Sequence, residues 1–228
     1  MRTLALIAVA ATGFAAGVTG LLEQARDAQD RGALDRIASE YSSAAQKSPN
    51  DAKAQYEAAL AYSYAAEVST EVKDKNKARD AAESGIKAAE KAVALAGNNG
   101  EYHRILGTLC GQIVPTNMLL AMKYGRCALD EVNKAIQLDP KSAEAYVSRG
   151  VGYYYLPPSF GGGLNVAIRD FRKAIELDPK SAEAYLWLGV ALRKSGKNAD
   201  ARAAFQKSKE LNPKRVWAQQ QFEKTPAQ

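Results

Sequence analysis

The sequence predicts an all-α protein, a right-handed α-solenoid of about five antiparallel helical hairpins with a C-terminal capping helix. Two observations favour this fold class. An eight-residue string that begins at Asp139-Pro140 recurs letter for letter from Asp178-Pro179, 39 residues later, and a weaker echo begins at Asn212-Pro213, a further 34 residues on. Between these strings, apolar residues recur at the spacing of an amphipathic helix. Self-similarity at such a period is typical of stacked helical hairpins.

The unit from residue 182 to 215 shows why each half forms a helix. Its first half carries one apolar stripe at positions i, i+3, i+4 and i+7, namely Tyr185, Leu188, Gly189 and Leu192. Gly196 then suits the left-handed residue that follows a helix C-terminus. The second half carries Ala201 and Phe205, and it ends before Pro213, which lacks a backbone N–H. The small residues let the two helices approach closely.

This series resembles the tetratricopeptide repeat. The residues that carry the resemblance are Tyr185, Leu188, Gly189, Ala201, Phe205 and Pro213. Leu192 and Ser208 depart from it, because the motif usually has Tyr and Ala there. The resemblance implies a solenoid whose first helices line a concave groove for a segment of a partner protein.

The preceding unit, residues 143–181, is five residues longer, and the extra residues fall in a loop rich in proline and glycine. We expect this loop to shape one rim of the groove, with its aromatic ring folded onto Tyr153 or Tyr155. Its motif residues are Pro157, Pro158, Phe160, Gly161 and Gly162. The motif resembles a P-x-x-F-G-G loop of exported bacterial repeat proteins that are similar to the T-component of TRAP-type solute transporters. This resemblance covers roughly residues 100 to 213, but the chain lacks the lipoprotein cysteine of that component.

The other units follow the same register with longer helices. We expect repeats at about 18–51, 52–99 and 100–142, a capping helix at 216–223 and a disordered tail at 224–228. Trp217 and Phe222 would cover the last hairpin, whose open end needs a lid. Arg149 occupies the position that Leu188 holds in the next repeat, so it needs a buried polar partner.

The N-terminus, residues 1–20, reads as a signal peptide. Arg2 precedes an apolar run from Leu4 to about Val18, which is too short to span a bilayer comfortably. The alternative is an uncleaved anchor. No cysteine lies near the cleavage region, so we expect an exported protein, periplasmic or secreted, that is not a lipoprotein. The formal net charge of +6 is modest for 228 residues and does not indicate a nucleic-acid partner.

The sequence carries little catalytic chemistry. It has a single histidine, His103, at a position where the repeat uses a packing aromatic, and it has no phosphate-loop, zinc-protease or nucleophile-elbow motif. We therefore expect no enzyme, no cofactor and no metal. If the turn between the helices centres near Thr116, Cys110 faces about residue 122. Cys127 would then lie roughly 7–8 Å too far along its helix, and two buried free thiols are favoured over a disulfide.

The groove is the candidate functional site. In repeat register its lining residues are Tyr56, Tyr64, Arg104, Val147, Tyr154, Tyr155, Leu186, Arg193 and Lys194. Aromatic rings beside basic side chains suit an acidic segment or a C-terminal carboxylate. The alternative is that several of these tyrosines only pack between helices.

These observations favour a non-enzymatic adaptor that binds a peptide segment of another protein in its concave groove. The alternative is a solute-binding accessory of a TRAP-type transporter. It would hold an acidic ligand against Arg149, in a closed cavity beside the proline–glycine loop. A purely structural role is a third possibility.

Overall fold

The structure, a computed structural model, describes residues 14–227, without the side chains of residues 14–18, 118 and 160. This part of the chain forms eleven α-helices, two short 3₁₀ segments and no strand. The helices are α1 (Phe14–Asp27), α2 (Arg31–Lys47), α3 (Ala52–Glu71), α4 (Lys75–Leu95), α5 (Gly100–Ile113), α6 (Met118–Leu138), α7 (Ala143–Tyr155), α8 (Leu164–Leu177), α9 (Ala182–Lys194), α10 (Asn198–Leu211) and α11 (Val216–Glu223). The 3₁₀ segments are η1 (Val114–Thr116) and η2 (Pro158–Phe160).

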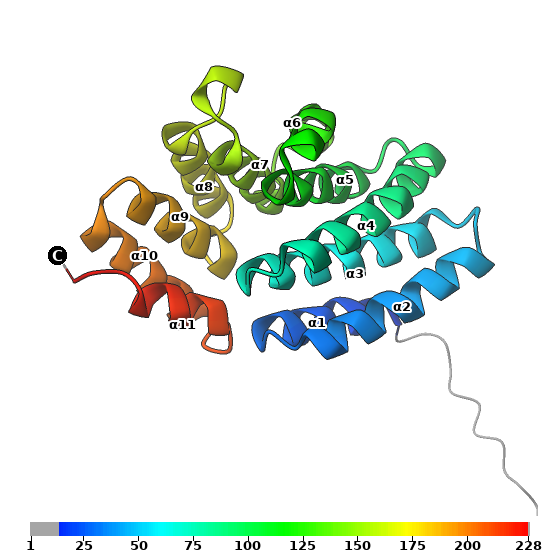
Figure 1. The fold of residues 1–228 in the computed structure, drawn as a ribbon, viewed down its shortest axis with the longest axis horizontal. Helices are drawn as coiled ribbons and strands as arrows, with labels where there is room; N and C mark the ends of the chain where they lie inside the picture. Colours follow the sequence, from blue (N-terminus) through cyan, green and yellow to red (C-terminus); the bar gives the residue numbers. More distant parts are fainter. Residues whose placement is uncertain (1–13, 228) are drawn as a thin grey trace, which may run out of the picture.

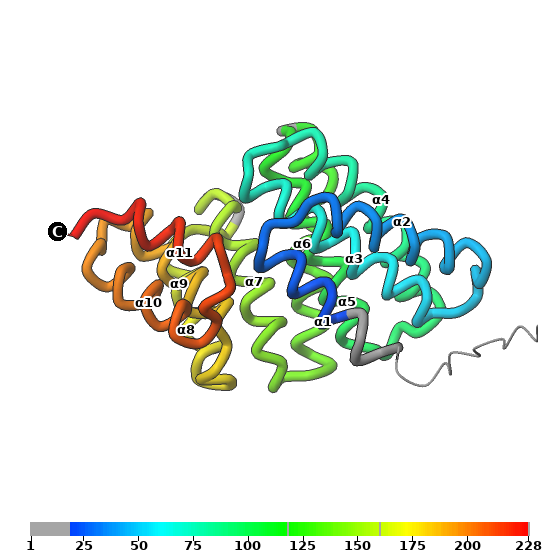
Figure 2. The backbone as a smooth tube through the Cα atoms, turned by 90° about the horizontal axis from the view of Figure 1, so that it is seen from below, coloured from blue at the N-terminus to red at the C-terminus, as the bar shows by residue number. Residues whose placement is uncertain are grey.

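Five antiparallel hairpins follow one another, and α11 lies on the last of them (Figure 1). Each helix packs mainly on its neighbours in sequence, and the odd-numbered helices also contact one another. The hairpins bend into an arc that brings α11 round towards α1 (Figures 1 and 2). The predicted fold class is confirmed: the described residues form an α-solenoid of antiparallel helical hairpins with a C-terminal helix.

Seven of the described helices begin directly after a residue whose side chain caps the first turn. Asp51, Asp74 and Asn99 each accept a hydrogen bond from a backbone N–H of the following first turn. In the repeated string, Ser142 and Ser181 do the same for α7 and α9. These bonds satisfy N–H groups that have no partner within the helix.

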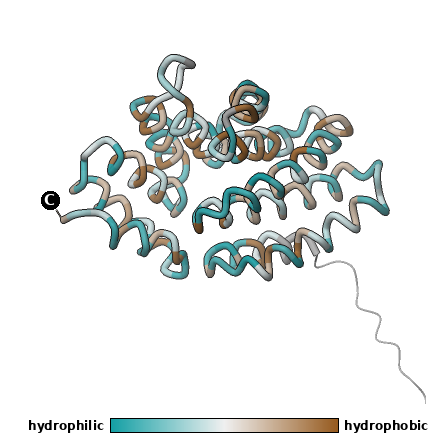
Figure 3. Tube along the Cα trace, in the orientation of Figure 1, coloured by the Kyte–Doolittle hydropathy of each residue, from teal (hydrophilic) through white to brown (hydrophobic). Residues whose placement is uncertain are grey.

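Small residues set the distance between paired helices. A Cβ added at Gly189 would lie 2.6 Å from the ring of Phe205, and one added at Gly150 would lie 2.5 Å from that of Phe171. The glycine–phenylalanine pairs of the motif are therefore direct contacts. Apolar residues gather where the helices face one another, and hydrophilic residues lie on the outer surfaces (Figure 3).

The loop between α7 and α8 makes a tight return. Gly161 and Gly163 have φ angles of 83° and 114°, in the region that favours glycine. A Cβ on Gly162 would lie 2.1 Å from the carbonyl oxygen of Leu156. The Gly163 N–H donates to the Tyr153 carbonyl oxygen over 2.8 Å. The predicted contact of the Phe160 ring with Tyr153 or Tyr155 lies outside the described side chains.

The prediction of free thiols is wrong. Cys110 and Cys127 form a disulfide, with a Cα–Cα distance of 5.9 Å. The 3₁₀ segment η1 and the extended residue Asn117 lengthen the connection between α5 and α6. The first turn of α6 therefore extends past the end of α5. Leu119 is 76% exposed there. The residue that faces Cys110 is thus shifted from about 122 to 127.

Two predictions concern the ends of the chain. Thr225, which the sequence placed in a disordered tail, is buried, and its carbonyl oxygen accepts a hydrogen bond from Arg202 over 2.7 Å. The predicted signal peptide, residues 1–20, falls largely on residues 1–13, which lie outside the described range. None of the helices in the described range is long and apolar enough to cross a membrane.

Candidate functional site

The concave side of the arc holds a cavity of about 580 Å³. Residues of α1, α3, α5, α7, α9 and α11 line it, so each hairpin contributes its first helix. This is the surface on which the sequence placed a groove. The groove is not open along its whole length, however, because the two ends of the solenoid meet.

The ends meet where α11 lies beside α1, as two perpendicular views show (Figures 1 and 2). Asn212 Nδ2 donates to Asp27 Oδ2 over 2.7 Å, and Gln220 Nε2 donates to Gln29 Oε1 over 3.0 Å. These residues are 185 and 191 positions apart in sequence. The tips that approach each other are hydrophilic (Figure 3). The seam is therefore polar and built from side chains.

Arg215 is the centre of this seam, and its side chain is 0% exposed. Its Nε donates to Glu183 Oε1 over 2.8 Å, and its Nη2 donates to Glu67 Oε1 over 2.7 Å. It also donates to both carboxylate oxygens of Glu71. One guanidinium thus joins α3, α9 and the start of α11.

Arg26 is the second cation of the seam. It donates to Asp27 and lies 3.6 Å from Glu183. Together with Arg215 it faces four carboxylates, those of Asp27, Glu67, Glu71 and Glu183, so that the cluster has two negative charges in excess when every group is ionised.

Burial and the neighbouring guanidinium groups shift the pKa values of these carboxyl groups in opposite directions. Burial raises the pKa of Glu67 to about 7, although Arg215 and Arg26 lower it in part. Burial likewise raises the pKa of Glu71 above its ordinary value. Burial also acts to raise the pKa of Glu183, but the two arginines outweigh it, so this pKa lies below the ordinary value. Glu67 is the carboxyl that relieves the excess of negative charge by binding a proton.

A second polar group lies on α5. Arg104 forms two hydrogen bonds of 2.6 Å with the carboxylate of Glu101, which also accepts from the hydroxyl of Tyr56 over 2.9 Å. Further along the helix, the Gln112 side chain donates to the carbonyl oxygen of Ser63, while its own Oε1 is buried and accepts no hydrogen bond from the described residues.

Aromatic rings from α3, α7, α9 and α11 line the cavity. Trp187 lies 5.2 Å from Trp217 and 6.4 Å from Tyr155, measured between ring centroids. Tyr64 lines the cavity on α3, with the guanidinium of Arg26 5.3 Å from its ring centroid. Aromatic faces and carboxylates therefore share this cavity.

Four of the predicted groove residues line the cavity: Tyr64, Arg104, Val147 and Tyr155. The others lie elsewhere. Tyr56 stacks on Tyr102 with centroids 4.9 Å apart, and Tyr154 packs against Trp187. The prediction for Leu186 is wrong, because this side chain is 0% exposed. The neighbouring residue on α9, Trp187, faces the cavity instead.

Arg193 and Lys194 are also absent from the lining. Arg193 Nη1 donates to the carbonyl oxygen of Gln221 over 3.2 Å, so it fixes α11 on α9. The ammonium of Lys194 lies 4.2 Å from the ring centroid of Tyr154. Both side chains are used in packing rather than directed at the cavity.

Arg149 has its partner within the chain. Its Nε donates to Asp170 over 2.7 Å and its Nη1 donates to Asn133 over 3.0 Å. The buried polar partner that the sequence required for Arg149 is therefore Asp170, and Arg149 does not line the cavity. His103 is buried as predicted, with hydrogen bonds to Glu131 and to the carbonyl oxygen of Gly97.

The loop motif does not shape the cavity. None of Pro157, Pro158, Gly161 or Gly162 lines it, and the loop rises from the outer side of the arc (Figure 1). No group of three or more His, Cys, Asp or Glu side chains within residues 14–227 is placed to hold a metal ion.

Sequence reasoning missed Arg215 and the acidic residues around it. One signal was present: Arg215 stands where the two earlier copies of the repeat have the capping serines Ser142 and Ser181. Accordingly, α11 lacks a side-chain cap at this residue. The departure from the repeat marks the residue that closes the arc.

Two family profiles match the chain. The first, described as regulator of microtubule dynamics protein 1-3, matches residues 21–156, and the second, described as tetratricopeptide repeat, matches residues 161–215. A comparison with curated proteins found no significant match.

Three solved structures, two of them described as TPR proteins, align with this chain. TTC0263, a thermophilic TPR protein from Thermus thermophilus, aligns with a TM-score of 0.63 at 17% identity, over 91% of this chain and 97% of that one. YrrB, described as a TPR protein with an unusual peptide-binding site, aligns with a TM-score of 0.45 at 21% identity, over 90% and 96%. MamA from Desulfovibrio magneticus RS-1 aligns with a TM-score of 0.47 at 19% identity, over 86% and 93%.

Proposed function

This chain belongs to the family described as regulator of microtubule dynamics protein 1-3, and from that premise we propose that it is a non-enzymatic interaction module that binds a segment of a partner protein in its concave cavity. Tetratricopeptide solenoids are typical binding scaffolds, with extended concave surfaces.

The observation that carries this proposal is the cavity itself. First helices from all five hairpins and α11 line about 580 Å³ of space, which lies within the range of roughly 300–1,000 Å³ typical of ligand sites. Its walls combine aromatic rings with polar groups, among them a buried amide oxygen of Gln112 that no described residue satisfies. Such a lining offers both contact area and orientation to a bound segment.

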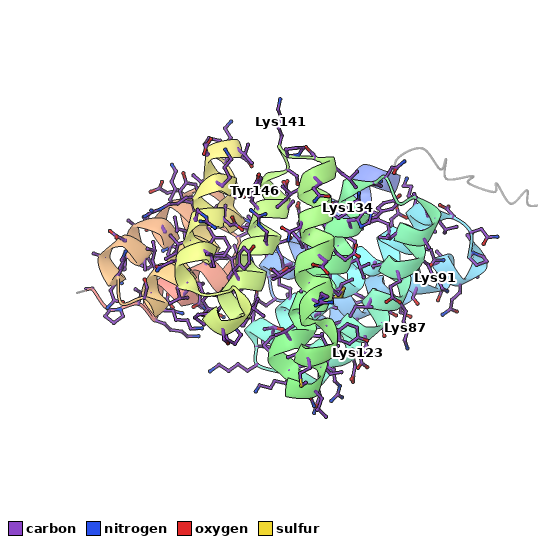
Figure 4. The ribbon with its side chains drawn as sticks, turned by 90° about the horizontal axis from the view of Figure 1, so that it is seen from above. Lys87, Lys91, Lys123, Lys134, Lys141 and Tyr146 are labelled. Carbon is purple, nitrogen blue, oxygen red and sulfur yellow. A yellow bond between two sulfur atoms is a disulfide. The ribbon has the colours of Figure 1, made fainter. Side chains whose placement is uncertain are left out.

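Site-specific crosslinking tests the proposal. A photoreactive amino acid at Val151, which lines the cavity, should crosslink in cells to a segment of another protein, and mass spectrometry identifies that segment. The same amino acid at Lys141, which is exposed on the outer side (Figure 4), is the matched control and should not capture this segment. Capture from position 141 and not from position 151 would place the binding surface outside the cavity.

The solute-binding alternative receives less support. It requires the proline–glycine loop in the wall of the cavity and Arg149 free to meet a ligand. The loop residues do not line the cavity, and Arg149 is bound to Asp170. The resemblance of the loop to exported relatives of the TRAP-type T-component stays a proposal about ancestry.

We also propose that the chain is exported to the cell envelope with residues 1–20 as its signal peptide. The disulfide between Cys110 and Cys127 supports this, since disulfides persist mainly in oxidising compartments. Alkylation of thiols in intact cells, followed by a gel-shift assay, tests it. An oxidised pair agrees with export, and a fully reduced pair in growing cells would contradict it.

A further inference from the structure

Charge is distributed unequally between the inside and the outside of this protein. Counted over the described residues, seven carboxylates and three basic side chains line the cavity; with the buried Arg215, which binds several of these carboxylates, the excess is three negative charges when all are ionised. The whole chain has a formal net charge of +6. Exposed lysines account for part of the difference. Lys87 and Lys91 on α4 and Lys123 and Lys134 on α6 lie on the outer face, away from the cavity (Figure 4).

Three of the lining carboxylates form no ion pair within residues 14–227: Glu23, Glu144 and Asp178. Glu23 and Glu144 are exposed, so they lie towards solvent. Deeper in the cavity, the cluster around Arg215 has two more carboxylates than guanidinium groups. Negative charge is therefore in excess both at the exposed part of the lining and at depth.

The chain already shows which chemistry these walls accept. The guanidinium of Arg215 lies among three glutamates and 5.6 Å from the ring centroid of Trp217. Arg26 is placed in the same way, between carboxylates and the ring of Tyr64. A cation held by carboxylates on one side and an aromatic face on the other is favourable, most of all where water is excluded.

Two further aromatic rings of the cavity wall lie beside this cluster. Tyr155 and Trp187 line the cavity next to Trp217, and no cation lies over either ring in the described part of the chain. Glu67 and Glu71 line the same cavity as these two rings. The wall thus repeats the surroundings of Arg215 without a cation in place.

From this geometry we infer that the cavity binds a basic peptide segment, with a lysine or arginine side chain between the rings of Tyr155 and Trp187 and the carboxylate of Glu67, which is 22% exposed. The inference rests on the proposed function and names the chemistry of the partner. It replaces the acidic segment expected from the sequence.

The protonation of Glu67 supports this assignment. Burial raises the pKa of this carboxyl to about 7, so it holds a proton in part of the molecules at neutral pH. An arriving cation favours the charged form, so binding should release protons from the protein. Calorimetry in buffers of different ionisation enthalpy measures that release.

The test is selection of random twelve-residue peptides on the full chain. Peptides retained by the wild type should be enriched in lysine and arginine at least about threefold over the starting library. Their affinity should fall as salt concentration rises. The double variant Glu23→Gln with Glu144→Gln should bind them roughly three- to tenfold more weakly at an unchanged melting temperature, because neither carboxylate forms an ion pair within residues 14–227. Glu40→Gln with Glu90→Gln is the matched control, because both carboxylates are exposed, do not line the cavity and form no ion pair within residues 14–227.

Each other result overturns a defined part of the argument. Retained peptides that are neutral or acidic would refute the inference and leave the proposed function standing. Two variants, Val151→Trp and Thr108→Trp, each fill the cavity, and at least one should fold and lose the peptides. If both variants fold and still bind the selected peptides, or if the wild type retains no more peptide than these variants do, the inference and the proposed function are refuted together. Spermidine that binds as tightly as the selected peptides would refute a peptide partner.

Discussion

Replacing Arg215 with methionine should destabilise the contacts that join the two ends of the solenoid. The side chain is 0% exposed, and its removal leaves Glu67, Glu71 and Glu183 facing one another without their shared cation. Breaking a buried ion pair by removing one partner costs about 3–5 kcal/mol, because the remaining charge stays buried. At roughly 2–4 °C per kcal/mol for a protein of this size, the melting temperature should fall by at least about 6 °C.

Urea unfolding followed by circular dichroism measures this loss. Arg172→Met is the control, since Arg172 is exposed on α8, and it should change stability by less than about 0.5 kcal/mol. Adding Glu67→Gln and Glu71→Gln to Arg215→Met should recover part of the loss, because it removes the unpaired charges. A stability loss for Arg215→Met as small as that of the control would show that the seam does not hold the two ends together.

Three further changes test other parts of the structure. Gly189→Leu adds a side chain where a Cβ alone would lie 2.6 Å from a phenylalanine ring. It should lower the free energy of unfolding in urea by about 1–3 kcal/mol. Gly125→Leu is the control and should lower it far less, because a Cβ at Gly125 meets no atom within 4 Å. Glu67→Gln tests the raised pKa. Between pH 4.5 and about 7 the folded wild type keeps a proton on Glu67 that the unfolded chain has lost. The free energy of unfolding of the wild type should therefore fall relative to that of the variant as pH rises, by about 3 kcal/mol at most. The same difference between wild type and variant in urea unfolding at pH 5 and at pH 8 would contradict this. Reduction of the bridge between Cys110 and Cys127, which are 17 positions apart, should lower stability by about 3 kcal/mol, and a melt that does not change with dithiothreitol would argue against the bridge.

The local structure could be predicted because the repeat motif occurs in two copies with the same pattern of residues. The glycine and phenylalanine of the motif, such as Gly189 and Phe205, lie where helical periodicity places them, since both belong to one hairpin. The register of Cys110 and Cys127 was not predictable in the same way. It depends on the conformation of η1 and Asn117, which moves the start of α6 without altering its periodicity.

The closed arc could not be derived from any one repeat. Each hairpin adds a small rotation, and only their sum brings Arg215 to residues 144 and 148 positions earlier in the chain, Glu71 and Glu67. The acidic character of the cavity has the same origin, because its carboxylates come from separate helices and form no run in the sequence. The repeat register also misassigned Leu186, since a small rotation of α9 decides whether this residue or Trp187 faces inwards.

The most direct test of the closed arc is the distance between its two ends. Spin labels at Gln24 on α1 and Gln219 on α11, both exposed, can be measured by pulsed electron resonance in the full chain with its disulfide intact. The wild type should give one narrow distance distribution, and Arg215→Met should give a longer and broader one. A wild-type distribution as broad as that of the variant would contradict a cavity closed by Arg215.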